Sequence, residues 1–103
     1  MLQIFITGGT FDKEYNYING ALYFKDTHLP EMLQRGRCTL DIDFKTLMMV
    51  DSLEMTDEDR AIIAHNCRRT ALQRIVITHG TDTIVETASF LAKADIPDKT
   101  IVL

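Results

Sequence analysis

The sequence predicts an α/β fold of three layers, in which helices flank a mainly parallel sheet. Two observations carry this prediction. Short apolar runs at residues 2–7, 74–78 and 100–103 are bounded by glycine or polar residues, which is typical of buried strands. Segments with the period of amphipathic helices lie between these runs. Strands that alternate with helices of this length form crossover units, and such units build parallel sheets.

The first strand is expected at residues 2–7, where a run rich in Ile and Phe ends abruptly at Gly8. Residues 11–19 are polar and aromatic and have no helical period, so we expect a loop there. A short strand at residues 21–24 should follow this loop.

A short helix is expected next. Thr27 or His28 can stand near its cap, and Pro30 suits its first turn. Glu31 favours the positive end of the helix dipole, and Gly36 is expected to stop the helix.

Residues 38–45 alternate between apolar and polar side chains, which is the period of a half-exposed strand. The continuous apolar run at residues 47–50 predicts a strand covered on both faces. Cys38 lies in the alternating pattern and Cys67 in a helical one. Both are therefore expected to be small buried side chains, without a disulfide between them.

The clearest helix begins at Thr56, a good N-cap that is followed by acidic residues in the first turn. A strand at residues 74–78 comes next, then a second helix at about residues 82–94. A turn with a proline leads into the last strand, at residues 100–103. The side chains expected to face the core from the two helices are Ile63, Cys67, Ala71, Ile84, Ala88 and Leu91.

Length and composition limit the class of protein. A chain of 103 residues with 46% hydrophobic residues predicts one globular domain, residues 1–103, and its end within a strand predicts that this domain is partial. The net charge of −4 and the scattered basic residues argue against a nucleic-acid partner. No apolar run reaches the roughly 18 residues of a membrane span. Because the first residues also lack a secretory pattern, we expect a cytoplasmic location.

No metal site and no cofactor are expected. His28, His65 and His79 have no spacing that places two ligands on one face. The glycines at residues 8–9 also lack the patterns of dinucleotide- and phosphate-binding loops.

Polar residues follow strands at three places: residues 8–10, 51–52 and 80–82. In open α/β sheets, ligands bind beyond the carboxyl ends of the strands. We therefore expect these segments to line one crevice, and this convergence is the strongest functional signal that the residues themselves give.

The first of these segments predicts a nucleophile. Gly8 and Gly9 let the backbone turn sharply and expose amide N–H groups, and Thr10 follows with a hydroxyl. A hydroxyl beside N–H donors is what acyl transfer requires, because the hydroxyl attacks a carbonyl and the donors hold the oxyanion. The alternative is that Thr10 only hydrogen-bonds within a tight turn.

The other two segments allow two interpretations each. Asp82 is either an N-cap, with Thr81 its neighbour in the turn, or a carboxylate that receives a substrate ammonium group. Ser52 either closes a turn or presents its hydroxyl and N–H to a substrate carboxylate.

Three segments together resemble bacterial-type L-asparaginases. Ile-Thr-Gly-Gly-Thr at residues 6–10 is similar to the amino-terminal signature of the family. Asp-Ser-Leu-Glu-Met at residues 51–55 resembles its Asp-Ser-x-x-Met segment. Thr-His-Gly-Thr-Asp-Thr at residues 78–83, with Glu-Thr-Ala at 86–88, is similar to the second signature. The segments occur in the order of the family, and the resemblance covers essentially the whole chain.

The resemblance implies the amino-terminal domain of an amidohydrolase that converts L-asparagine to L-aspartate and ammonia. Thr10 would attack the side-chain amide and form an acyl-enzyme, which water then hydrolyses. Thr81 would lie on the other side of the carbonyl. Asp82 would hold the α-ammonium group of the substrate, and Ser52 its α-carboxylate.

Further residues enter the site by the same resemblance. In the family, a tyrosine from the loop after the first strand assists the nucleophile. Tyr15, Tyr17 and Tyr23 are the candidates here, and the first two lie in the more loop-like part. Residues expected to line the substrate site are Gly9, Ser52, Leu53, Gly80, Thr81 and Asp82.

Two departures leave other functions open. The family pairs Thr81 and Asp82 with a lysine that comes much later in the chain, and neither Lys93 nor Lys99 fits that role. Leu53 and Glu54 stand where many members have polar substrate contacts, which leaves the amino-acid selectivity open. The alternatives are a non-catalytic module that binds an amino acid, and a glutaminase or an amidase of the kind that acts on amidated tRNA. The resemblance also implies a small amino-acid amide as substrate and a homo-oligomer.

Overall fold

The computed structural model describes residues 1–15, 17–18, 20–24 and 26–103. Within these ranges it describes the backbone but not the side chains of Thr10, Tyr15, Tyr23 and Phe24.

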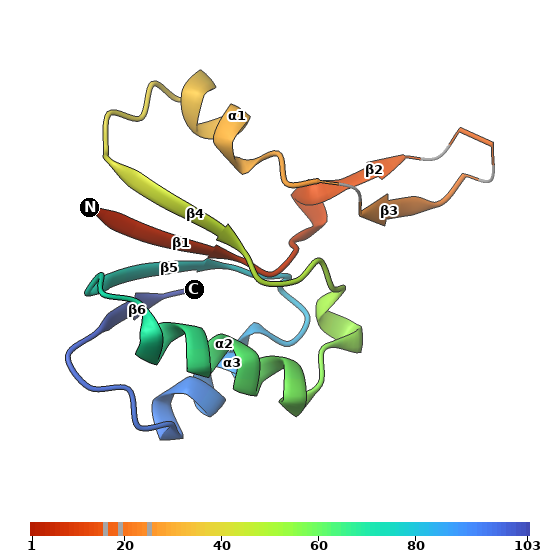
Figure 1. Cartoon of the computed structure of the whole chain (residues 1–103). Helices are drawn as coiled ribbons and strands as arrows, with labels where there is room; N and C mark the ends of the chain where they lie inside the picture. The colour runs from red at the N-terminus through yellow and green to blue at the C-terminus, as the bar shows by residue number, and fades with distance from the viewer. Residues whose placement is uncertain (16, 19, 25) are drawn as a thin grey trace.

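A central sheet lies between α1 on one face and α2 with α3 on the other, so the predicted three-layer α/β fold is confirmed (Figure 1). In chain order, the elements are β1 (Leu2–Ile6), the 3-10 helix η1 (Thr10–Asp12), β2 (Lys13–Tyr15), β3 (Leu22–Phe24), α1 (Leu29–Arg35), β4 (Ile42–Thr46), the 3-10 helix η2 (Ser52–Glu54), α2 (Asp57–Arg69), β5 (Arg74–Thr78), α3 (Ile84–Lys93) and β6 (Thr100–Val102).

The central sheet has the strand order β4-β1-β5-β6, and every pairing in it is parallel. In its register, Ile4 of β1 lies beside Phe44 of β4 and Val76 of β5. Because β1 has a partner on each side, its carboxyl end lies between the carboxyl ends of β4 and β5. This topology brings the loops that follow these three strands to one edge.

The main core lies between the sheet and α2 with α3. Phe5 of β1 and Ile75 and Ile77 of β5 point to this face and are at most 2% exposed. They pack with Ile63 of α2 and Leu91 of α3, among others. The opposite face of the sheet, under α1, is less completely covered.

The predicted strand at residues 47–50 is wrong. Residues 47–50 contain no strand, and the amide N–H groups of Leu47 and Val50 donate instead to the carbonyls of Ile6 and Thr7, at 2.9 and 3.0 Å. The segment therefore follows the exit of β1 towards η2. Its apolar side chains pack against the main core, and this packing explains the apolar run.

The strand predicted at residues 38–45 begins only at Ile42. The amide of Cys38 donates to the carbonyl of Leu33, at 2.9 Å, and Arg37 has a φ of 55°, so this part of the chain still closes the end of α1. Cys38 is exposed, and the prediction that it is buried is wrong. Cys67 is buried as predicted, and burial raises the pKa of its thiol to about 11.

The prediction that residues 11–19 form a loop is wrong at Lys13–Tyr15, which form β2. Lys13–Tyr15 pair antiparallel with Leu22–Phe24, so the chain makes a hairpin that projects from the sheet (Figure 1). Residues 16 and 19 lie outside the described part. The short strand predicted at 21–24 is confirmed as β3 within one residue.

The helix predictions are largely confirmed. Thr56 caps α2 with a capping box, in which the Thr56 hydroxyl accepts from the Asp59 amide and the Asp59 carboxylate accepts from the Thr56 amide. Gly36 ends α1, as predicted. Two side chains predicted to face the core are exposed, however. Ala71 lies beyond the end of α2, and Ala88 is replaced on the inner face of α3 by its neighbour Thr87.

Candidate functional site

The three segments with polar residues do meet at the carboxyl edge of the sheet. The loop after β1 contributes residues 7–9, the segment after β4 contributes η2, and the loop after β5 contributes residues 79–83. Figure 1 shows all three on the side to which β1, β4 and β5 point. The crossover topology accounts for this placement, since parallel strands end at the same edge.

Gly8 fixes the position of the first loop beside the second. Its φ is +100°, a conformation that residues with a side chain rarely adopt. A Cβ at this position would lie only 2.8 Å from the backbone nitrogen of Val50. The two segments are thus in backbone contact, and glycine is required by both the angle and the space.

Gly9 brings the first loop to the third. A Cβ at Gly9 would lie 3.6 Å from the carbonyl oxygen of His79. Just before it, the hydroxyl of Thr7 donates to the carbonyl of Thr78, at 2.5 Å, and Thr7 itself is fully buried. The loop after β1 is therefore flanked by the other two loops.

Thr10, the candidate nucleophile, is the first residue of η1, which is closed by a hydrogen bond from the Asp12 amide to the Gly9 carbonyl, at 2.9 Å. The side chain of Thr10 is outside the described part of the structure, and so is the direction of its hydroxyl. Its role as nucleophile stays a prediction.

Ser52 connects the second loop to the third. Its hydroxyl accepts from the Asp82 amide, at 3.2 Å, and lies 3.5 Å from a carboxylate oxygen of Asp82. The hydroxyl of Thr83 donates to the Ser52 carbonyl, at 2.6 Å. A Cβ at Gly80 would lie 2.7 Å from the Ser52 hydroxyl oxygen, so this close approach depends on glycine.

Ser52 is only 2% exposed, and its hydroxyl is already engaged by Asp82. The hydroxyl accepts from the Asp82 amide, so its proton can still be donated to a substrate carboxylate in place of the 3.5 Å contact with the Asp82 carboxylate. The role expected for Ser52 stays a prediction, and the structure adds a second role, as the link between the two loops.

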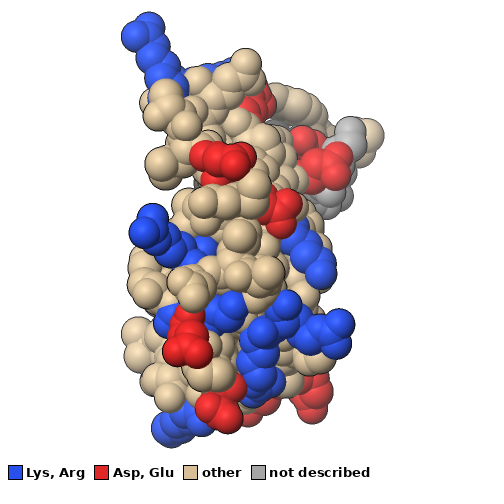
Figure 2. Space-filling model, turned by 60° about the vertical axis from the view of Figure 1, so that its left-hand side comes forward, with Lys and Arg blue, Asp and Glu red and all other residues tan. Residues whose placement is uncertain are grey.

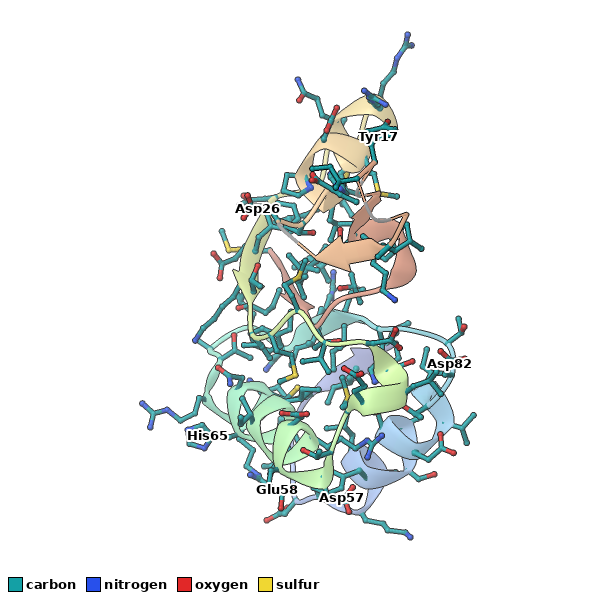
Figure 3. All side chains as sticks on the ribbon, turned by 90° about the vertical axis from the view of Figure 1, so that its right-hand side faces the viewer. Tyr17, Asp26, Asp57, Glu58, His65 and Asp82 are labelled. Atoms are coloured by element: carbon teal, nitrogen blue, oxygen red, sulfur yellow. The ribbon has the colours of Figure 1, made fainter. Side chains whose placement is uncertain are left out.

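Asp82 does not cap α3, so that interpretation is wrong. Thr83 is the N-cap residue, and no side chain accepts a hydrogen bond there. Asp82 is exposed at the edge of the sheet (Figure 3), and within the described part of the chain it forms no ion pair. Its carboxylate can therefore receive a cationic group. Its neighbour Thr81 is also exposed, as is Leu53, at 71%.

The comparisons with known proteins agree with this arrangement. Residues 1–103 match the family model for the N-terminal domain of asparaginase. The chain belongs to this family.

Two solved structures of the asparaginase family are similar to this chain. The thermostable L-asparaginase from Thermococcus kodakarensis is 29% identical, with a TM-score of 0.69 over 85% of this chain and 28% of the other. A probable cytoplasmic L-asparaginase from Campylobacter jejuni is also 29% identical, with a TM-score of 0.69 over 87% of this chain and 29% of the other. The chain thus spans less than a third of the length of these structures. Among curated proteins, none matches it significantly.

The tyrosines that the resemblance to asparaginases singled out lie on the hairpin. Tyr17 is 90% exposed near the hairpin tip, and Figure 3 shows it well apart from Asp82. Tyr15 ends β2, and its side chain lies outside the described part. The structure therefore does not bring Tyr17 to the other candidate residues.

Lys13 links the base of the hairpin to the site. Its ammonium group contacts the Asp51 carboxylate, at 2.6 Å, and the other oxygen of Asp51 accepts from the Leu53 amide, at 3.1 Å. The hydrogen bond from Lys13, followed by that from Leu53, holds the pKa of Asp51 below its ordinary value. This pair joins the hairpin to the residue next to Ser52.

A buried cluster of polar side chains lies behind the loop after β5, and it was not predicted from the sequence. His79 is 8% exposed, Arg60 7% and Thr87 0%, and they form one hydrogen-bonded chain. The sequence offered one signal, because His79 and Thr87 both lie within the segments that resemble the second asparaginase signature. Their hydropathy gave no reason to place them inside.

Other site types find no support among the described residues. No group of three potential metal-ligating side chains occurs in that part of the chain, and none of its helices is long and apolar enough to cross a membrane. Lysine and arginine side chains are spread over the face shown in Figure 2, with acidic side chains between them.

Proposed function

We propose that this chain forms the nucleophile-bearing half of an amidohydrolase site that hydrolyses the side-chain amide of L-asparagine. The observation that carries the proposal is the junction of Ser52, Gly80 and Asp82 beside the glycine loop after β1. It combines a carboxylate that has no ion partner among the described residues with a loop that leads directly to Thr10. Membership of the asparaginase family supports the same reaction class.

The proposed reaction has two steps. The hydroxyl oxygen of Thr10 attacks the amide carbon, the C–N bond breaks, and the nitrogen leaves as ammonia with the hydroxyl proton. Water then cleaves the resulting ester, which restores the Thr10 hydroxyl and releases L-aspartate. Asp82 would hold the α-ammonium group through a charge-assisted contact.

Thr10 requires a proton acceptor in this reaction. Lys99 is unsuited to this task, because it donates to the carbonyls of Thr70 and Leu72 beside the amino end of β5. Since the chain covers only 28–29% of the two asparaginase structures, we propose that residues outside these 103 complete the site. A cytoplasmic homo-oligomer is part of the same proposal.

A binding module without turnover is the second candidate. It is favoured by the exposed Asp82 carboxylate, which can receive an α-ammonium group whether or not Thr10 reacts. Such a module would bind L-aspartate or L-asparagine and release no ammonia.

The test measures ammonia release from L-asparagine by the wild-type protein with the residues that complete the site present, and by its Thr10→Ala and Thr39→Ala variants. Thr39 is exposed before β4, so its variant carries the same chemical change away from the site. We expect release by the wild type and by Thr39→Ala, and loss of at least about a thousandfold in Thr10→Ala. Equal release by all three would remove Thr10 from the reaction. L-Aspartate binding by calorimetry, without any release, would establish the binding module instead.

A further inference from the structure

His79 lies at the exit of β5, directly under the loop that carries Thr81 and Asp82. Its Nδ1 is 2.6 Å from the carbonyl oxygen of Gly80, and its Nε2 is 2.7 Å from the hydroxyl oxygen of Thr87. The ring is thus held at both nitrogens, by the loop on one side and by α3 on the other.

Arg60 donates to the hydroxyl that faces the ring. Its Nε–H can only donate, and it lies 2.9 Å from the Thr87 hydroxyl oxygen. The proton of this hydroxyl then has two acceptors within reach, Nε2 of His79 at 2.7 Å and the sulfur of Met55 at 3.6 Å, and Nε2 is the nearer and stronger of them. A second Arg60 nitrogen, Nη1, donates to Asp57, at 3.1 Å, so the buried guanidinium group has a charge partner. Figure 3 shows Asp57 at the start of α2, below the loop that carries Asp82.

The other side of the ring leads to the same assignment independently. A carbonyl oxygen can only accept, so the 2.6 Å contact with Gly80 requires a proton on Nδ1 of His79. In the neutral imidazole Nε2 is then the acceptor for Thr87. In this form all three hydrogen bonds run in one direction, from Arg60 through Thr87 and His79 to the Gly80 carbonyl.

This chain fixes the orientation of one peptide group. The Gly80 carbonyl points inward to His79, and the described backbone contains no cis peptide bond. In a planar trans peptide the N–H lies opposite the C=O, so the N–H of Thr81 points away from the core. Thr81 is exposed on that outer side.

We propose that His79 is a positioning residue for Thr81 and Asp82, held in place by Thr87 and Arg60. The proposal rests on the proposed function only in treating Thr81 and Asp82 as the residues that meet the substrate. Ser52 holds the same loop from the side of η2, at the Asp82 amide. The loop is thus fixed between α3 and η2 before any substrate binds.

The test compares Thr87→Val with Thr87→Ser. Valine has nearly the shape of threonine but cannot bond His79, whereas serine keeps the hydroxyl. Thr70→Val is the matched control, because the Thr70 hydroxyl also donates to a side chain, that of Gln3, at 3.0 Å, but beside the amino end of β5. NMR relaxation of the Thr81 and Asp82 amides, with a urea unfolding curve for each variant, gives the readout.

We expect Thr87→Val to increase the amplitude of motion of the Thr81 and Asp82 amides, while Thr87→Ser and Thr70→Val leave these amides as in the wild type. L-Aspartate should bind about tenfold more weakly to Thr87→Val than to Thr87→Ser. Unchanged loop amides in a folded Thr87→Val variant would overturn the proposal and leave Thr87 as a core residue only.

A valine at position 87 leaves the buried Arg60 without one acceptor, so Thr87→Val alone could fail to fold. The double variant Arg60→Met with Thr87→Val removes both partners and is judged by the same amides. The wild type gives an independent check, through long-range correlation of the imidazole nitrogens of His79. A proton on Nε2 instead of Nδ1 would overturn the proposal whatever the variants show. Absence of both ammonia release and amino-acid binding would refute the proposed function, and the loop amides would still decide the role of His79.

Discussion

The loop after β5 and the hairpin after β1 border the same edge of the sheet, but they are held in different ways. The loop is fixed from below by the buried chain that ends at His79 and from the side by Ser52. The hairpin projects from the sheet and carries Tyr17 at 90% exposure. Two acidic residues at its base, Asp12 and Asp51, anchor it through polar contacts.

This difference divides the candidate site into two parts. The part with Asp82 is organised by the same core that folds the domain, so substrate binding there needs little rearrangement. The part with Tyr17 and the hairpin is joined to the rest of the domain by polar contacts near its base, among them those of Asp12 and Asp51. We therefore expect core substitutions to affect the loop and the whole fold together, and substitutions at Asp12 or Asp51 to act mainly on the hairpin and α1.

The largest effect is expected for Ile63→Ala, in the core beneath the loop. Ile63 is fully buried, and its removal should lower the free energy of unfolding by about 2–5 kcal/mol. Ile62→Ala in the same helix is the control, because Ile62 is 48% exposed and should lose less than about 1 kcal/mol. Urea unfolding measures both. Similar losses of stability in the two variants would contradict the assignment of Ile63 to the buried face of α2.

A smaller effect is expected at Asp12, which joins the base of the hairpin to α1. Asp12 is fully buried, and one carboxylate oxygen accepts from the His28 amide, at 2.7 Å, and from the Thr27 hydroxyl, at 3.0 Å. Asp12→Ala removes both bonds and should cost about 2 kcal/mol. It should also end the protection of the His28 amide from hydrogen exchange.

Asp12→Asn is the control for this prediction, because its carbonyl oxygen can still accept both bonds. The second carboxylate oxygen of Asp12 is buried without a partner among the described residues, so the charge gains nothing there. We expect Asn to lose less than half as much stability as Ala and to keep His28 protected. Equal losses of stability in Asp12→Asn and Asp12→Ala would mean that the negative charge of Asp12, and not its hydrogen-bond acceptor, holds the base of the hairpin.

The sequence predicted those elements whose local pattern agrees with their final environment. The strand at Arg74–Thr78 and the helix that begins after Thr56 were placed correctly, because an apolar run and an N-cap threonine followed by acidic residues are local signals. β2 was missed, since Lys13–Tyr15 show no alternation of apolar and polar residues and their pairing with β3 leaves no local signal. Residues 47–50 were assigned to a strand because packing against the main core produces the same apolar run.

The candidate site, too, could be predicted from the sequence only in part. The convergence of three loops could be predicted, because it follows from parallel topology alone. The contact between Ser52 and Asp82 could not be predicted, since it depends on the position at which η2 meets the loop after β5. Ala88 and not Thr87 was predicted to face the core, because a threonine is expected there only when a buried partner exists. Its partners, Arg60 and His79, come from elements that the sequence does not show to be adjacent.

The smallest effect is expected for the ion pair between Lys13 and Asp51, and it tests how firmly the hairpin is joined to η2. Both side chains are partly exposed, so solvent weakens the pair. The pKa of Asp51 is below its ordinary value of 3.8, mainly through the hydrogen bond from Lys13. A carboxyl group whose pKa is lowered by folding stabilises the folded state above the unfolded pKa, and this contribution is lost as pH falls through the folded pKa.

Lys13→Met should therefore raise the pKa of Asp51 towards 3.8, without reaching it, because the Leu53 amide still donates to the carboxylate. Carboxyl carbon NMR over the acid range measures this shift. Any stability that the variant loses near neutral pH should disappear at a pH below the folded pKa of Asp51. Arg35→Met, which breaks the exposed pair with Glu31 on α1, is the control and should leave Asp51 unchanged. An Asp51 titration that is the same in Lys13→Met and wild type would show that the hairpin base is not held at η2, and that Asp12 alone anchors it.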